Sequence, residues 1–145
     1  SAGWSENTEA WTVEARKRVA FELPARNETN VWMKTVRPLL VVRCQQGRIE
    51  AFVFTDSPAA MEPQDEDHTV RLSFDGDTGR TERWPDSSTH DALFAPDGAA
   101  FSAQIMQAES LRFGYTPHNA SPVVAHFDVR GLREKLSPSA ACAGK

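Results

Sequence analysis

The 145-residue sequence lacks a long apolar run and any surplus of basic residues. Its longest apolar stretch, Pro38 to Val42, ends at Arg43, whereas a membrane-spanning helix needs about 20 apolar residues. Lysine and arginine together number 16 against 20 aspartate and glutamate residues, so the net charge is −4. Binding to nucleic acid requires clustered basic residues. The sequence therefore predicts neither a transmembrane segment nor a nucleic-acid partner.

Motifs for hydrolysis are also missing. No Gly-x-Ser-x-Gly elbow occurs in the sequence. Ser87, Ser88, His90 and Asp91 supply the residue types of a hydrolytic triad, but neighbouring residues in one loop rarely face one another. We expect Ser87 to hold its loop by hydrogen bonds to the backbone. The competing interpretation is a hydrolase-like enzyme whose site forms from dispersed residues near His90 and Asp91.

Histidine and acidic residues do not follow the spacing of metal ligands. The four histidines, at positions 68, 90, 118 and 126, include no pair at zinc-ligand spacing. Residues 65–68 are adjacent, so their side chains should splay apart. Asp75 and Asp77 resemble the start of a calcium loop, but Gly79 comes one position early and Asp86 stands where a glutamate is expected. We predict no metal and no cofactor, and we expect His126 to lie at the surface or a sheet edge.

Cysteine is scarce as well, since the chain has only Cys44 and Cys142. The two thiols are either paired in an oxidising compartment or unpaired and buried. Hydrophobic residues make up 40% and charged residues 25% of the chain, a composition typical of a folded domain. We predict one β-rich domain over 1–145, with residues 1–9 and 56–68 mobile.

Alternating apolar and polar residues recur along the chain, which is typical of half-buried β-strands. We predict strands over 11–16, 18–23, 31–36, 70–74, 81–84, 111–115 and 123–129, with a polar loop over 24–30. Segments 39–44 and 49–55 alternate little and flank Gly47, so they predict a central hairpin that is covered on both faces. Asp97 is the expected N-cap of a helix to about Gln107, and a shorter helix holds Leu132 and Leu136. The predicted fold class is mainly β: an antiparallel β-sandwich or a strongly bent sheet with two short helices.

Arginine and tryptophan residues suggest structural roles and one candidate contact. Arg43 and Arg71 lie at strand ends or polar positions, where each can pair with a carboxylate such as Asp75 or Asp128. Trp32 has the opposite phase from its neighbours, so either the sheet is covered on both sides or Trp32 lies at the surface. We favour burial of Trp32, and it is also the residue that we name as a possible partner-binding anchor.

A further set of motifs occurs in a defined order along the chain. It comprises Pro38 to Cys44, Gly47, Glu50 to Thr55, Val70 to Asp75, Arg83-Trp84 to Ser87, Leu93-Phe94, Phe101 with Gln104, Leu111 to Phe113, Thr116-Pro117, Ala125 to Asp128 and Gly131-Leu132 before Cys142. This ordered set resembles the VasI-like family of exported bacterial proteins, some of which are associated with type VI secretion. The resemblance covers residues 36–142 and is less clear over 1–35.

The resemblance implies a periplasmic or secreted β-rich domain with a disulfide between Cys44 and Cys142. The sequence begins at Ser1 without methionine, so we expect that a signal peptide has been removed. The family resemblance does not imply an enzyme. The leading interpretation is an exported, non-catalytic domain that binds a protein or cell-envelope partner through a sheet edge or an aromatic face. The family resemblance implies a role as a secretion-system accessory.

Overall fold

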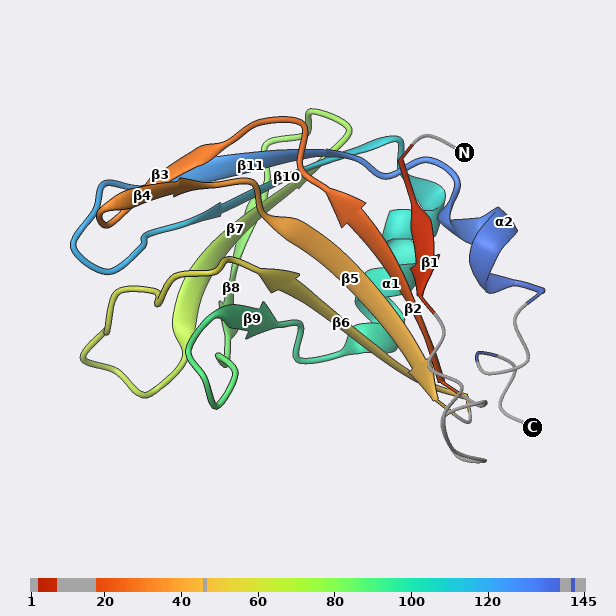
Figure 1. Ribbon diagram of the computed structural model, residues 1–145, viewed down its shortest axis with the longest axis horizontal. Coiled ribbons are helices and arrows are strands. Elements are labelled where there is room, and N and C mark those ends of the chain that lie inside the picture. Colours follow the sequence, from red (N-terminus) through yellow and green to blue (C-terminus); the bar gives the residue numbers. More distant parts are fainter. Residues whose placement is uncertain (1–2, 8–17, 46, 139–141, 143–145) are drawn as a thin grey trace.

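The computed structural model describes residues 3–7, 18–45, 47–138 and 142. These ranges contain eleven strands and two helices, shown in Figure 1. The strands are β1 (Ser5–Asn7), β2 (Arg18–Pro24), β3 (Thr29–Val31), β4 (Lys34–Val36), β5 (Leu39–Gln45), β6 (Arg48–Phe54), β7 (His68–Phe74), β8 (Arg80–Trp84), β9 (Ala92–Phe94), β10 (Ser110–Tyr115) and β11 (Val123–Asp128). The helices are α1 (Gly98–Gln107) and α2 (Leu132–Leu136).

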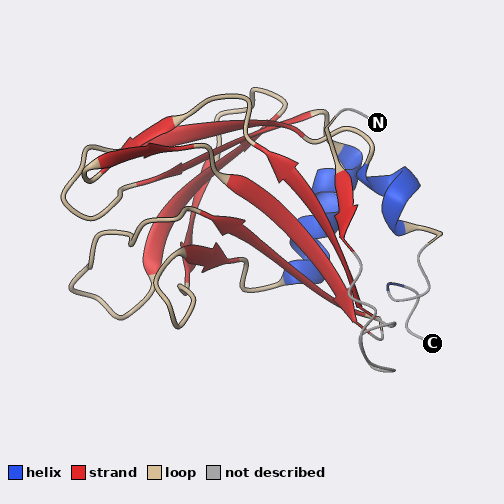
Figure 2. Cartoon of the chain, viewed as in Figure 1, coloured by secondary structure: helices blue, strands red, loops and turns tan. Residues whose placement is uncertain are grey.

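Two antiparallel sheets enclose one hydrophobic core. The first has the order β1-β2-β5-β6-β9 and the second β11-β10-β7-β8, while β3 and β4 form a separate two-stranded ribbon. Both sheets contribute buried side chains to a single cluster that includes Phe21, Val42, Leu72 and Phe113. Figure 2 shows the strands with the two helices at one end. The predicted fold class, a mainly β, sandwich-like domain with two short helices, is confirmed.

The hairpin of β5 and β6 lies at the centre of the first sheet, as predicted. Its two strands pair from Leu39 opposite Phe54 to Gln45 opposite Arg48. Gly47, with a φ of 81°, lies in the turn, where a left-handed backbone favours glycine. The expectation that both faces are covered holds for Val41, which is buried, but not fully for β6, where Phe52 and Phe54 are only half-buried.

The segment 31–36 is not the single strand that its alternation predicts. The chain instead forms a hairpin in which Thr29 pairs with Val36 and Val31 with Lys34. Met33 has a φ of 68° and turns the backbone between the strands. The polar loop predicted over 24–30 is also too long, because β3 begins at Thr29. Alternation continues through the turn, so periodicity alone does not reveal it.

Helix α1 begins and ends close to its predicted limits. Asp97 is its N-cap, and the Asp97 carboxylate accepts a hydrogen bond from the Ala100 backbone N–H at 3.0 Å. Gly98 permits a close approach to β6, since a Cβ atom there would lie 2.4 Å from the Ile49 carbonyl oxygen. Phe101 is buried against the core. No helix among the described residues is long and apolar enough to cross a membrane.

Cys44 and Cys142 form a disulfide, with their Cα atoms 5.0 Å apart. Cys44 is fully buried near the end of β5, and Cys142 follows α2. The pairing that the family resemblance implies is therefore confirmed. The strand predicted over 11–16 lies outside the described residues, whereas β1 and β9 are three-residue strands that the alternation did not predict.

The polar residues assigned structural roles have partly different partners from those expected. Arg43 pairs with Glu50 across the β5–β6 hairpin, not with Asp75 or Asp128. The Asp75 carboxylate accepts hydrogen bonds from the backbone N–H groups of residues 109 and 110. Asp128 pairs with Arg130, two residues along the chain. Arg71 is exposed on β7, and it forms no ion pair with any residue that the structure describes.

Candidate functional site

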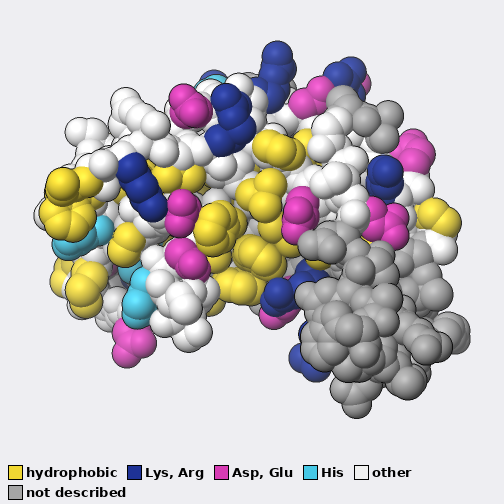
Figure 3. Space-filling model, viewed as in Figure 1, with side chains coloured by type: hydrophobic (Ala, Val, Ile, Leu, Met, Phe, Trp, Pro, Cys, Tyr) yellow, Lys and Arg dark blue, Asp and Glu magenta, His cyan; other side chains and the backbone are white. Residues whose placement is uncertain are grey.

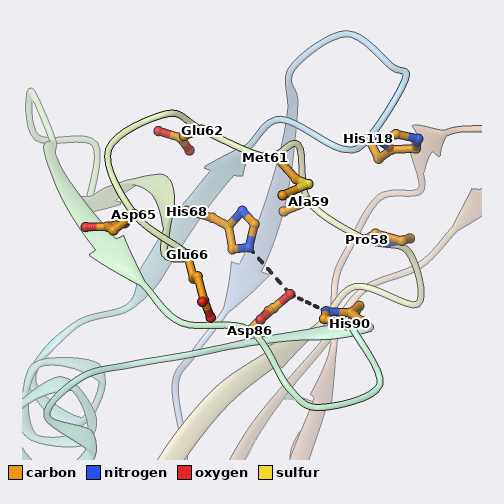
Figure 4. Close-up of a pocket in the computed structure, with 10 residues that line it drawn as sticks. All are labelled: Pro58, Ala59, Met61, Glu62, Asp65, Glu66, His68, Asp86, His90 and His118. Carbon is orange, nitrogen blue, oxygen red and sulfur yellow. Dashed lines mark hydrogen bonds and ion pairs between the residues drawn. The ribbon is translucent and has the colours of Figure 1, made fainter.

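A pocket of about 500 Å³ opens between the connections at the end of the molecule opposite the helices. The β6–β7 connection supplies most of its wall, the β8–β9 connection its floor, and the β10–β11 connection one side (Figure 4). Its lining residues are Pro58, Ala59, Met61, Glu62, Asp65, Glu66, His68, Asp86, His90 and His118. Three of the four histidines of the chain therefore meet in one pocket.

Backbone hydrogen bonds between the connections give the pocket its shape. The His118 N–H donates to the Pro58 carbonyl at 2.8 Å, and the Ala60 N–H donates to the Thr116 carbonyl at 2.9 Å. At the other side, the Thr55 N–H donates to the Asp91 carbonyl at 2.8 Å. The β6–β7 connection is thus attached to both neighbouring connections. The mobility predicted for 56–68 stays a prediction.

Asp86 lies between two imidazole rings in the pocket. His68 begins β7, and its side chain is only 7% exposed. Its Nδ1 lies 2.8 Å from the Ala60 carbonyl oxygen, so Nδ1 must donate, because a carbonyl oxygen only accepts. Its Nε2 lies 3.4 Å from Asp86 Oδ2, and the same oxygen lies 2.7 Å from His90 Nδ1 (Figure 4).

Arg83, on β8, pairs with two of the acidic residues that line the pocket. Its guanidinium donates to the carboxylates of Glu62 and Asp65, and also to the Thr69 hydroxyl at 2.8 Å. Burial acts to raise the pKa of Glu62, but hydrogen bonds from Thr69 and Arg83 outweigh it and lower that pKa. The hydrogen bond from Arg83 likewise lowers the pKa of Asp65. Both carboxylates are therefore ionised and paired at neutral pH.

The pairing with Asp86 predicts a measurable change in the titration of His90. A hydrogen bond to Asp86 and the charge of that carboxylate raise the pKa of His90 above its usual value of about 6.5. Asp86→Asn is expected to return the pKa toward that value, because the amide carries no charge. NMR titration of the His90 ring Cε1–H in both proteins measures the shift.

Because the pKa of His90 is raised in the folded state, the free energy of unfolding depends on pH in a defined direction. The Asp86–His90 pair stabilises the folded state fully below the unfolded pKa, and this contribution disappears as the pH rises through the folded pKa. His126, exposed on β11 outside the pocket, is the internal control, whose resonances should not respond to the substitution. An unchanged His90 pKa in Asp86→Asn would contradict the pairing.

The residues of the possible hydrolytic triad belong to two separate hydrogen-bond groups. Ser87 donates from Oγ to the Asp91 carboxylate at 2.8 Å and accepts from the Asp91 backbone N–H at 3.1 Å. Hydrogen bonds from Thr89 and then Ser87 lower the pKa of Asp91. The His90 ring forms a hydrogen bond with the Asp86 carboxylate, and no hydrogen bond joins the ring to Asp91 or to a described serine hydroxyl. The loop-holding role predicted for Ser87 matches these contacts.

The carboxylates that resemble a calcium loop contact backbone groups. Asp77 accepts a hydrogen bond from the Gly79 N–H at 2.8 Å, and Asp75 holds the start of β10 as described above. In the other acidic segment, residues 65–68, the Asp65 carboxylate also accepts a hydrogen bond from a backbone group, the Asp67 N–H, at 2.9 Å. Within the described ranges, no group of three or more histidine, cysteine, aspartate or glutamate side chains is placed to hold a metal ion.

A second candidate surface is the outer face of the five-stranded sheet, which we call the aromatic face. Side chains in β6 and β9 alternate between the two faces of the sheet. Val53 and Leu93 point into the core. Phe52, Phe54 and Phe94 point outward, and all three are half-buried. The rings of Phe52 and Phe94 stack with their centroids 4.6 Å apart. Figure 3 looks onto this side of the molecule, where hydrophobic side chains gather over β5 and β6.

Charged residues border the aromatic face. The Arg43 guanidinium lies 5.1 Å from the centroid of the Phe52 ring while it pairs with Glu50. At the opposite border, Lys34 pairs with Asp56 at 3.2 Å. An apolar centre with a charged border is the usual arrangement of a protein-binding surface.

The burial favoured for Trp32 is wrong. Trp32 lies in the β3–β4 turn and is 53% exposed, next to Met33, which is 83% exposed. The Trp32 ring meets the His118 ring edge-on, with centroids 5.9 Å apart. Because His118 also lines the pocket, Trp32 lies at the border of that site. Because Trp32 is exposed, its surface is accessible to a partner. Its role as a partner-binding anchor stays a prediction.

The comparisons with known proteins add no family to this description. No family model, curated protein or solved structure matches the chain. The resemblance to the VasI-like family therefore stays a prediction.

Proposed function

We propose that this chain is an exported, non-catalytic β-rich domain that binds a protein of the cell envelope through the aromatic face. The observation that carries the proposal is the group of half-exposed phenylalanine rings on the outer side of β6 and β9. Contiguous apolar surface is uncommon on a domain that has no partner, and aromatic residues are enriched in protein interfaces.

The disulfide supports the compartment that the proposal requires. Disulfides persist mainly in oxidising environments such as the periplasm or the extracellular space. The Cys44–Cys142 bond is therefore consistent with an exported protein. The resemblance to the VasI-like family points the same way and suggests a role as a secretion-system accessory.

The contacts of the candidate catalytic residues support a binding role over hydrolysis. Asp91 is bonded to Ser87 and Thr89, and His90 is bonded to Asp86. A hydrolytic site requires a histidine that contacts a nucleophile and an acid that orients the histidine. The described residues near His90 and Asp91 have different contacts.

Phe54→Ser tests the aromatic face directly. Phe54 is half-buried and pairs with Leu39, so its truncation should remove apolar contact area from the surface while the core side of β6 stays intact. We expect envelope proteins retained by the immobilised wild-type chain to be recovered about tenfold less on Phe54→Ser, the usual effect of losing an aromatic anchor. Quantitative mass spectrometry of the bound fraction measures this ratio.

The matched control is Val124→Ser, which truncates a hydrophobic residue that is 43% exposed on β11, away from the aromatic face. Its bound fraction should equal that of the wild type. Near-ultraviolet circular dichroism establishes that both variants remain folded. Equal recovery on Phe54→Ser and on the wild-type chain would overturn the assignment of the binding surface.

A further inference from the structure

We propose that the pocket between the β6–β7, β8–β9 and β10–β11 connections binds an organic cation with a short apolar body, such as an alkylguanidinium group. The site is separate from the aromatic face and does not depend on the function proposed for it. Its size, about 500 Å³, lies within the range of small-molecule sites.

The charge of the pocket wall favours a cation. Four carboxylates line it, and the lining includes no lysine or arginine. Arg83 pairs with Glu62 and Asp65 from outside the lining. Asp86 and Glu66 have no such cation among the described residues, since the contacts of Asp86 are the rings of His68 and His90. A cationic ligand would therefore meet two carboxylates, Asp86 and Glu66, that no lysine or arginine among the described residues pairs with.

The contacts of Asp86 provide an independent reason. Its carboxylate is contacted by His68 Nε2 at 3.4 Å and by His90 Nδ1 at 2.7 Å, and both contacts are to Oδ2. A carboxylate can accept about four hydrogen bonds. Asp86 therefore has further acceptor capacity, which N–H donors of a cation can satisfy.

The remaining walls suit the apolar part of such a ligand. Pro58, Ala59 and Met61, on the β6–β7 connection, line another part of the pocket wall (Figure 4). Met61 is 88% exposed, so it gains contact area when a ligand covers it. A planar guanidinium also stacks on aromatic rings, and the His118 and Trp32 rings lie at the border.

The test uses n-butylguanidinium and its neutral analogue n-butylurea, which has nearly the same shape. Each is titrated into the isotope-labelled chain at pH 7.5, with the shifts of backbone amides and histidine rings followed by NMR. We expect saturable shifts at His68, His90 and His118 for the cation, and binding at least about tenfold weaker for the urea. Equal affinity for both compounds, or shifts outside the pocket only, would overturn the proposal.

Glu66→Gln provides the matching variant, because Glu66 is exposed and no hydrogen bond joins its side chain to another described residue. It should weaken n-butylguanidinium binding about threefold or more. Glu28→Gln removes the same charge from an exposed position outside the pocket and should leave binding unchanged. An equal loss in both variants would show non-specific attraction and overturn the proposal.

The source of the cation is distinguished by a second pair of probes. These are acetyl-Gly-Arg-Gly-amide and the same peptide with citrulline in place of arginine. If the arginine peptide binds more tightly than n-butylguanidinium, the pocket receives an arginine side chain of a protein; if it binds more weakly, the pocket receives a free small molecule. Both outcomes support a cation site, and neither depends on Phe54.

Discussion

Cys142→Ala is expected to lower the free energy of unfolding by about 4 kcal/mol. The disulfide joins residues separated by 98 positions, and a cross-link that closes a loop of this length removes much of the conformational freedom of the unfolded chain. The expected loss is a large share of the ~5–15 kcal/mol that stabilises a typical domain. Urea unfolding, followed by tryptophan fluorescence, measures the difference.

The single substitution separates the cross-link from packing in the core. Cys142 is only partly buried, whereas Cys44 is fully buried in β5. Cys142→Ala therefore leaves the Cys44 side chain in its site and removes little apolar contact. Cys44→Ala with Cys142→Ala should be less stable still, because it also truncates a buried side chain.

Reduced wild-type protein is the control for this prediction. Its free energy of unfolding should match that of Cys142→Ala, and alkylation under denaturing conditions should find no free thiol before reduction. A variant that unfolds at the same urea concentration as the oxidised wild type would contradict the stabilising role. Free thiols in protein recovered from its native source would contradict the exported compartment.

The strands were predictable where one face of the sheet is buried. In β7, Val70 and Leu72 are buried while Thr69 and Arg71 are exposed, and this period of two is visible in the sequence. The prediction fails at Met33, because the positive φ that forms the β3–β4 turn occurs at a residue type that rarely adopts it. No glycine, asparagine or aspartate marks that turn.

The pocket was not predictable from spacing. His68 begins β7, Asp86 lies in the β8–β9 connection and His118 lies in the β10–β11 connection, and strand pairing brings these three segments together. Sequence patterns describe neighbours along the chain, whereas the order of strands in a sheet depends on packing of the whole domain. The sequence shows that the chain has four histidines, but it does not indicate which of them lie in the same pocket.

The aromatic face was partly predictable. The run of apolar residues around Phe52 and Phe54 indicated apolar side chains on both faces of β6. It did not indicate whether the outer face is covered, because a strand covered by another layer and a strand with a partly exposed outer face have the same pattern. The half-burial of Phe52, Phe54 and Phe94 distinguishes the two.

Trp84→Ala is expected to lower the free energy of unfolding by about 3–5 kcal/mol, the usual cost of truncating a fully buried aromatic residue. The Trp84 ring has no exposed surface and meets the rings of Phe101 and Phe113 with centroids 5.2 and 5.3 Å apart. It thereby joins β8 to α1 and β10. Its Nε1–H also donates to the Glu82 carboxylate at 2.8 Å.

Two further variants make this prediction decisive. Trp84→Phe keeps an aromatic ring in the site, so it should cost clearly less than Trp84→Ala and should remain folded if the alanine variant does not. Trp32→Ala removes the same side chain from an exposed turn and should change the free energy of unfolding by no more than about 0.5 kcal/mol. Equal losses for Trp32→Ala and Trp84→Ala would contradict the burial of Trp84. A large loss confined to position 84 would show that Trp84 stabilises the core, whereas Trp32 is free to contact a partner or a ligand beside His118.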